Sequence, residues 1–412
     1  MPSMPAAQDG TALAPAEAEV RKVKRGSRRG PGQPGLYGIL PDSLIPEPTL
    51  GQNMSPRGPE LAPSSAPANP GLLAGLSPAS FGIVMATGIV SLACASLGLP
   101  SVGRWLFALN VLLYAVVWGL NLARLLRHPR RMRNDACDHG RAPGFFTAVA
   151  ASGVLGGQCL LLADARGAAM CLEAVAVVLW VVLSYGIFAA VMVKRDKPRL
   201  EQGMSGGWLL AVVATQALVG LGALLAPGLD EAWQGRLALA LLGLWLWGGV
   251  LYALLMSLIF YRIMFLPLSP TDLSPPYWIN MGAMAISTLA GTLLLQQSHA
   301  WPLLQTVQPF VQGVTLLFWA GGSWWIPLLL VLGVWRHGLQ RHPLRYEGLY
   351  WAMVFPLGMY AMATHHLALA LEQAWLEPLA RAFMWAALAA WALAALGLLG
   401  ALAQALRRPA GA

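Results

Sequence analysis

Ten long runs of apolar residues constrain the fold of this chain more than any other feature. They lie at 79–98, 104–125, 145–163, 169–193, 208–226, 237–263, 277–295, 310–335, 348–370 and 379–405. Each run is long enough to cross a bilayer as a tilted helix, whereas a closed β-barrel would need short alternating strands. Because the linkers between runs are short, neighbouring helices should pair as antiparallel hairpins. The sequence therefore predicts an all-α polytopic membrane protein with ten transmembrane helices in five hairpins.

The charge content supports this interpretation. Only 11% of the 412 residues are charged, against about 25% in soluble domains. The mean hydropathy is +0.58. We therefore expect a lipid bilayer as the solvent of this chain, and we expect neither a soluble enzyme nor a nucleic-acid-binding protein.

The N-terminal part of the chain has a different composition. The first 70 residues contain 13 of the 30 prolines and a basic cluster between Arg21 and Arg29, but no apolar run. Such a segment cannot bury enough apolar surface to offset the entropy of ordering. We predict that 1–74 is a disordered, proline-rich cytoplasmic tail and that 75–406 is the ten-helix domain. The basic cluster would tether the tail to anionic lipid, or the tail is simply solvated, or translation begins at Met54.

The basic residues predict the orientation in the membrane. Of the 27 Lys and Arg residues, 23 lie in the tail, the linkers after even-numbered spans or the C-terminus. The other four lie on the opposite side. They are Arg104, Arg166, Arg236 and Arg381. The positive-inside rule then predicts that both termini are cytoplasmic, with the protein in the inner (plasma) membrane.

The spans also differ in composition according to their order. Tryptophans well inside a span, such as Trp180 and Trp391, occur only in even-numbered spans, where we expect bulky aromatics to face lipid. Odd-numbered spans carry small and polar residues instead. These include Thr87, Gly88, Ser91, Gly153, Gly157, Asn280 and Thr364. We predict that the odd helices form an inner ring around a pore lined by such residues, with the even helices outside. Alternatively, the small residues only allow close helix packing, as in any bundle.

The spans lack the patterns of several enzyme classes. No span contains a deep pair of aspartates, a His-Glu-x-x-His motif or a Walker A motif. The adjacent His365 and His366 do not share one helix face, so they are poor ligands for a common metal ion. We therefore predict neither a metal site, nor a cofactor, nor enzymatic activity.

Three ionisable residues nevertheless lie inside the spans, namely Glu173, His365 and His366. Intramembrane ionisable residues are candidates for function by default. The two histidines would titrate near neutral pH, so that they and Glu173 are the candidates for coupling transport to protons. The alternatives are an interfacial Glu173 and neutral, hydrogen-bonded histidines at a vestibule.

Three segments resemble the tellurite-resistance/dicarboxylate transporter family. The first span contains FGIVMATGIVS at 81–91, the seventh YWINMGA at 277–283, and the ninth WAMVFPLGMY at 351–360. The resemblance extends over about 75–405. The family includes bacterial tellurite-resistance proteins, fungal malate permeases and sulfite efflux pumps, and plant slow anion channels.

The resemblance implies a homotrimer in which each protomer has its own pore within five helical hairpins. It also implies that Phe355 plugs the pore from the ninth helix, and that Pro356 and Gly358 kink this helix. The expected function is transport of small anions, either a C4-dicarboxylate such as malate or inorganic anions and oxyanions. A proton-coupled dicarboxylate or sulfite carrier is the alternative to a channel, and a non-transporting receptor or subunit is a third possibility.

Overall fold

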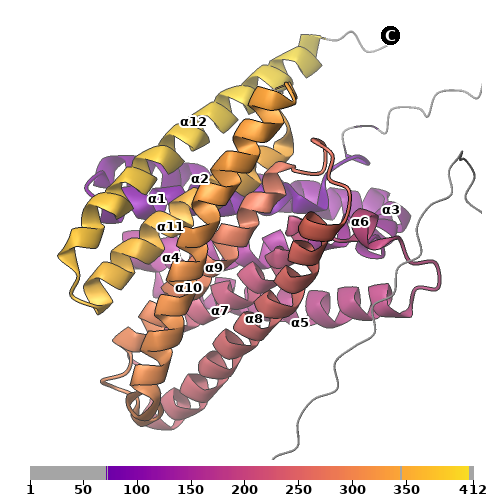
Figure 1. Cartoon of the computed structure of the whole chain (residues 1–412). Helices are drawn as coiled ribbons and strands as arrows, with labels where there is room; N and C mark the ends of the chain where they lie inside the picture. Colours follow the sequence, from indigo (N-terminus) through magenta and orange to yellow (C-terminus); the bar gives the residue numbers. More distant parts are fainter. Residues whose placement is uncertain (1–70, 72, 344–345, 408–412) are drawn as a thin grey trace, which may run out of the picture. The chain divides into compact units, whose positions relative to one another are not determined.

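The computed structural model describes residue 71, residues 73–343 and residues 346–407, and their regular structure is entirely helical (Figure 1). Ten long helices occupy the ten predicted spans. They are α1 (Gly82–Ser96), α2 (Pro100–Arg127), α4 (Phe146–Ala163), α5 (Arg166–Val193), α7 (Leu210–Leu225), α8 (Glu231–Phe265), α9 (Ile279–Gln296), α10 (Pro302–Val334), α11 (Trp351–Ala370) and α12 (Glu377–Arg407). Two short helices, α3 (Pro129–Ala136) and α6 (Leu200–Gly203), lie in the linkers. The predicted tail lies outside the described residues as far as residue 70.

The observed helix boundaries agree with the predicted spans within a few residues, except at the starts of α8 and α10. Helix α8 begins at Glu231, six residues before the predicted start at 237. Helix α10 begins at Pro302, eight residues before the predicted start at 310. The sequence suggests a break because Pro309 and several glutamines occupy the first turns. In the structure Pro302 stands at the helix start, where its missing N–H costs nothing, and Pro309 is accommodated inside the helix.

Nine of the described helical segments are long and apolar enough to cross a membrane. The helix outside this group is α11, which spans 20 residues but contains Pro356, His365 and His366. These residues lower the hydropathy of a helix whose burial is otherwise like that of its inner neighbours.

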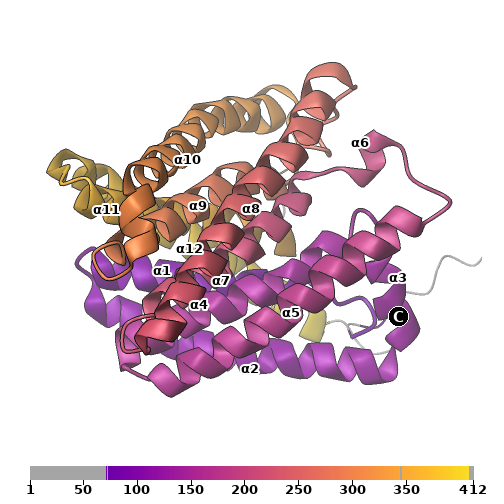
Figure 2. The same cartoon turned by 90° about the horizontal axis from the view of Figure 1, so that it is seen from below.

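The ten helices form five hairpins arranged in a closed ring. Each odd-numbered span packs against the following even-numbered span, as α9 and α10 do side by side in Figures 1 and 2. The first helices of the hairpins also pack against one another in the order α1, α4, α7, α9 and α11, and α11 contacts α1 again. This order confirms the predicted inner ring of odd-numbered spans.

Burial separates the two sets of helices. In the most apolar stretches of α1, α4, α7 and α9, 72–89% of the residues are buried, against 11–44% in α2, α5, α8, α10 and α12. Thirteen of the 20 residues of α11 are buried as well. The outer helices leave many large apolar side chains uncovered, as a lipid-facing surface requires.

Aromatic side chains of the outer helices link neighbouring hairpins. In four of the five links the aromatic group bonds to the hydroxyl of a Ser or Thr on the next inner helix, and in the fifth the Trp245 indole donates to the Ser287 carbonyl. The other four pairs are Tyr114 with Ser152, Trp180 with Thr215, Trp319 with Thr364, and Trp391 with Thr87. The expectation that interior tryptophans face lipid is wrong for Trp245, which is fully buried, and for Trp325, which is also buried.

Candidate functional site

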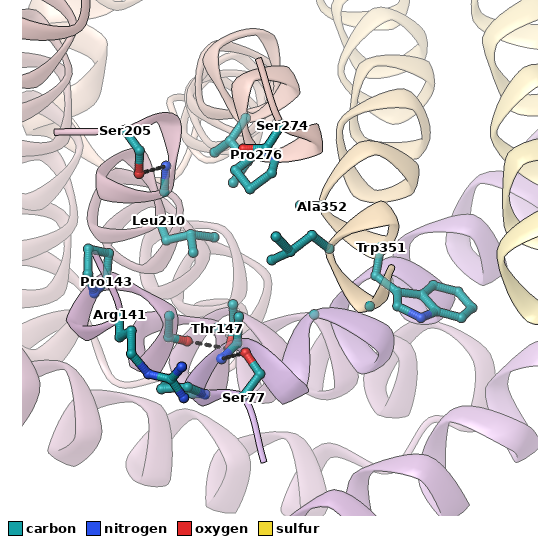
Figure 3. A pocket seen from close by; sticks show the side chains of 18 of the residues that line it. Ser77, Arg141, Pro143, Thr147, Ser205, Leu210, Ser274, Pro276, Trp351 and Ala352 are labelled. Carbon is teal, nitrogen blue, oxygen red and sulfur yellow. Dashed lines mark hydrogen bonds between the residues drawn. The ribbon is translucent and has the colours of Figure 1, made fainter. Parts of the chain in front are cut away.

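The N-terminal ends of the five inner helices surround a cavity of about 340 Å³, which we call the vestibule (Figure 3). Every hairpin contributes to its wall. Figure 3 shows Ser77 and Thr147 on one side and Ser205, Ser274 and Pro276 on another, with the side chain of Leu210 directed inward. By the charge pattern of the sequence, this is the predicted cytoplasmic end of the ring.

A repeated 3₁₀ turn builds the vestibule wall. Such a turn precedes each inner helix directly and begins with Pro, Gly or Ala, while four of the five end at an aromatic residue. The turns are Pro78–Phe81, Ala142–Phe145, Gly206–Leu209, Pro275–Trp278 and Gly348–Tyr350. Proline suits these positions because its fixed φ favours a helix start. The fivefold pattern was absent from the sequence-based expectations, although its small and aromatic residues are visible in the sequence.

Glycine is required where neighbouring turns approach each other. A Cβ atom at Gly144 would lie 2.8 Å from the Ala79 backbone nitrogen, and one at Gly206 would lie 2.5 Å from the Pro276 carbonyl oxygen. No real side chain tolerates such distances from backbone atoms. Close backbone contact thus holds the turns together and directs five helix N-termini to one cavity.

The electrostatic environment of the vestibule is positive. A helix N-terminus carries a partial positive charge of about half an elementary charge, and here five N-termini converge. Within the described part of the chain, Arg141 is the single charged residue that lines the vestibule. Its Nε lies 2.7 Å from Oδ1 of Asp135, which also pairs with the buried Arg124. Two guanidinium groups therefore share the Asp135 carboxylate at the rim, where Asp138 adds a second carboxylate that accepts the backbone N–H groups of Gly140 and Arg141. The positive potential of the vestibule thus comes mainly from the helix N-termini.

Phe355 is the vestibule residue that lies furthest along α11. It lines this cavity from α11, and its side chain has no exposed surface. One helical turn further, Met359 lines a second cavity of about 60 Å³, which we call the inner cavity. The wall of the inner cavity also contains residues from all five inner helices, including Ile89 and Leu293. Along α11, Phe355 is thus the last residue that lines the vestibule, and Met359 is the residue that lines the inner cavity.

Helix α11 is packed tightly around this position. Pro356 lies inside the helix and against Gly282 of α9, where a Cβ atom would be 2.8 Å from the proline Cγ. Gly358 lies against α1, where a Cβ atom would be 2.9 Å from Cγ2 of Ile89. These two contacts fix the rotation of α11 and therefore the direction of the Phe355 ring.

The structure brings only some of the predicted pore residues to the cavities. Gly153 and Gly157 of α4 line the inner cavity, and the remaining small and polar candidates contact neighbouring helices. Thr87 and Thr364 accept hydrogen bonds from outer-helix tryptophans, and Ser91 donates to the Gly103 carbonyl of α2. Gly88 and Asn280 also line neither cavity. A Cβ atom at Gly88 would meet Val154 and Asn110, and Asn280 is fully buried without a hydrogen-bond partner among the described residues.

The ionisable candidates lie away from the two cavities. The Nδ1 atom of His365 is 2.6 Å from Oε1 of Glu377, the first residue of α12. His366 Nδ1 is 3.4 Å from Nε2 of Gln296, at the end of α9. The Glu173 carboxylate lies against Gly222 of α7, and its buried Oε2 has no hydrogen-bond partner among the described residues. Sequence reasoning missed Glu377 and Arg141, because neither lies in the interior of a span.

Comparison with known proteins places the chain in a family. The family model described as voltage-dependent anion channel matches residues 75–399. The chain belongs to the voltage-dependent anion channel family. The match covers all ten long helices except the end of α12, and it confirms the resemblance found in the first, seventh and ninth spans.

Two similar proteins are described as a transporter and as a membrane protein. An uncharacterized transporter of Methanocaldococcus jannaschii is 25% identical over 297 residues, which are 69% of this chain and 82% of the relative. An uncharacterized membrane protein of Mycobacterium tuberculosis is 40% identical over 158 residues, or 38% of this chain and 80% of the relative. The family and these relatives identify the chain as a membrane protein of a channel and transporter family.

Proposed function

We propose that the chain conducts small anions across the plasma membrane through the vestibule and the inner cavity, and that Phe355 gates this path. One observation supports the proposal: all five inner helices line both cavities, and along α11 the buried Phe355 lines the vestibule one turn before Met359 lines the inner cavity. Each protomer of a homotrimer would then contain its own pore. Both termini would be cytoplasmic, so that the vestibule opens to the cytoplasm.

The charges of the path favour anions. Five helix N-termini and Arg141 make the vestibule positive, and the described residues that line the two cavities include no carboxylate. An anion entering the vestibule therefore exchanges part of its hydration for helix dipoles and hydroxyl groups such as those of Ser77 and Ser205.

The narrow part of the path is apolar. Besides Met359 and the amide of Gln216, the inner cavity is lined by aliphatic residues and glycine. Such a constriction closes a pore by excluding water as well as by bulk. A small displacement of the aromatic ring is then sufficient to change conductance. C4-dicarboxylates such as malate, and inorganic anions or oxyanions, are the substrates that we propose.

Ion selectivity tests this function directly. Purified protein in planar bilayers should give currents whose reversal potentials follow chloride, nitrate, malate or sulfite gradients. A matched experiment exchanges potassium for a large organic cation and should leave the reversal potential unchanged. Currents that follow the cation gradient, or an absence of current from folded protein with Phe355 replaced by alanine, would contradict the proposal.

A proton-coupled dicarboxylate or sulfite carrier is the second candidate, and the pair of His365 with Glu377 favours it. This titratable pair joins the far end of α11 to the start of α12. A proton accepted by this pair would act on α11, the helix that carries His365 and Phe355.

A further inference from the structure

A separate cavity of about 200 Å³ lies beside the inner ring, and we call it the side cavity. Its wall combines the end of α10, the segment before α9 and the start of α11. The apolar part of this wall includes Leu273, Leu329, Leu332 and Met353. None of these residues lines the vestibule or the inner cavity.

Arg336 gives this apolar cavity a cationic wall. Its side chain is only 7% exposed, and one guanidinium nitrogen donates to the Leu273 carbonyl at 2.6 Å. Its Nε is buried without a hydrogen-bond partner, and no carboxylate of the described residues forms an ion pair with it. A buried charge without a counterion is costly, so an anionic group in the side cavity would be stabilised.

The local backbone supports a binding role. Arg336 and His337 lie in a π-helical turn, Trp335–Leu339, that ends α10. Such turns are rare and frequently occur at functional sites. The turn places both Arg336 and His337 in the wall of the side cavity.

We propose that the side cavity binds the phosphate group of an anionic phospholipid from the adjacent leaflet. Arg336 would hold the phosphate, and Leu329 and Leu332 would contact the glycerol and the first methylenes of the chain. The cavity is smaller than the 300–1,000 Å³ typical of drug-sized ligands, so the remaining acyl chain must extend outside it.

A bound lipid would touch the helix that carries Phe355. Met353 in the side-cavity wall precedes Phe355 by two residues, and Ser274 lines both the side cavity and the vestibule. The proposed lipid site does not depend on the proposed transport function, because it is inferred from the side cavity and the unpaired guanidinium group of Arg336. Its test therefore measures lipid binding and does not require a measurement of anion transport.

Gly333 allows the site to be blocked without removing the charge. It lines the side cavity, and a Cβ atom added there meets no heavy atom within 4 Å. Gly333→Leu should fill the cavity while retaining the fold, since leucine also favours a helix more than glycine does. Gly313→Leu is the matched control, because Gly313 lies in the same helix with equally open space but outside the cavity.

Native mass spectrometry of the full-length protein measures the binding. With added phosphatidylglycerol, the wild type and Gly313→Leu should retain bound lipid. Gly333→Leu and Arg336→Gln should reduce the bound fraction at least about tenfold, because a charge-assisted contact is lost or blocked. Arg131→Gln, which removes an exposed arginine of α3, should bind as the wild type does.

Three results would overturn the proposal. The first is wild-type lipid binding by Gly333→Leu, and the second is equal retention of phosphatidylcholine with the same acyl chains. The third is displacement of phosphatidylglycerol by inorganic phosphate at equal concentration, which would identify the ligand as a soluble anion instead. A melting curve for each variant distinguishes loss of the site from loss of the fold.

Discussion

Replacing Phe355 with alanine should join the vestibule to the inner cavity. The two cavities measure about 340 and 60 Å³, and along α11 Phe355 lines the first and Met359, one turn further, the second. Removing the ring leaves Met359 as the next side chain along the same face of α11. We expect anion conductance to rise at least about tenfold, which corresponds to a barrier lowered by about 1.4 kcal/mol. Phe355→Leu should have an intermediate effect, because part of the bulk remains.

The stability of the same variant distinguishes a gate from a packing residue. A fully buried phenylalanine in a closed core costs about 3–5 kcal/mol when replaced with alanine, because a cavity remains. Phe146 is equally buried but lines neither cavity, so Phe146→Ala should show this full cost. Space opened at Phe355 adjoins the vestibule and fills with water. Phe355→Ala should therefore cost clearly less than Phe146→Ala.

Planar-bilayer recordings measure the conductance, and unfolding in detergent at matched lipid content measures the stability. The variant must first elute in the same oligomeric state as the wild type. If Phe355→Ala leaves the conductance unchanged and destabilises the protein as much as Phe146→Ala, then Phe355 is a packing residue and the gating argument fails.

Four further predictions follow from the site and its surroundings. In single-channel recordings, Arg141→Gln should lower anion conductance, and the loss should be larger at low than at high salt because salt screens an exposed charge. The control variant Arg131→Gln should leave the conductance unchanged. For a proton-coupled carrier, replacing His365 and His366 with Gln should flatten the pH dependence of uptake, and an unaltered profile would exclude them from coupling. Thr87→Val removes the acceptor of one inter-hairpin hydrogen bond and should lower the free energy of unfolding by about 0.6–1.7 kcal/mol; no loss would show that the bond is dispensable. Fused reporters should be cytoplasmic after residues 135, 197 and 340 and periplasmic after 165, 230 and 300, so a periplasmic signal after 197 would refute the topology.

The sequence predicts the helices well because long apolar runs have few structural alternatives. It also predicts the ring, since small and polar residues mark the helices that pack closely. It does not predict which way each side chain faces. Thr87 and Gly153 look equivalent in sequence, but Thr87 contacts α12 and Gly153 lines the inner cavity. That difference depends on the rotation of each helix, which its neighbours determine.

The sequence also does not predict the contacts between side chains of different helices. The pairing of His365 with Glu377 requires the short turn between α11 and α12 to return the chain onto the histidine. The buried Arg124, counted in the sequence only as a cytoplasmic charge, is neutralised by Asp135 in the following short helix α3. Neither pair follows from the composition of a single span.

The aromatic links between hairpins bear on how such a pore opens. Because α12 bonds back to α1, the set of five hairpins has no free edge along which it can separate. Widening the whole ring would strain all five links together, whereas turning one side chain strains none of them. A transporter that works by alternating access needs an interface along which its two halves can separate. In the described helices, a hydrogen bond crosses each interface between neighbouring hairpins. The architecture thus favours a rigid ring of helices inside which a single side chain moves, as in a channel.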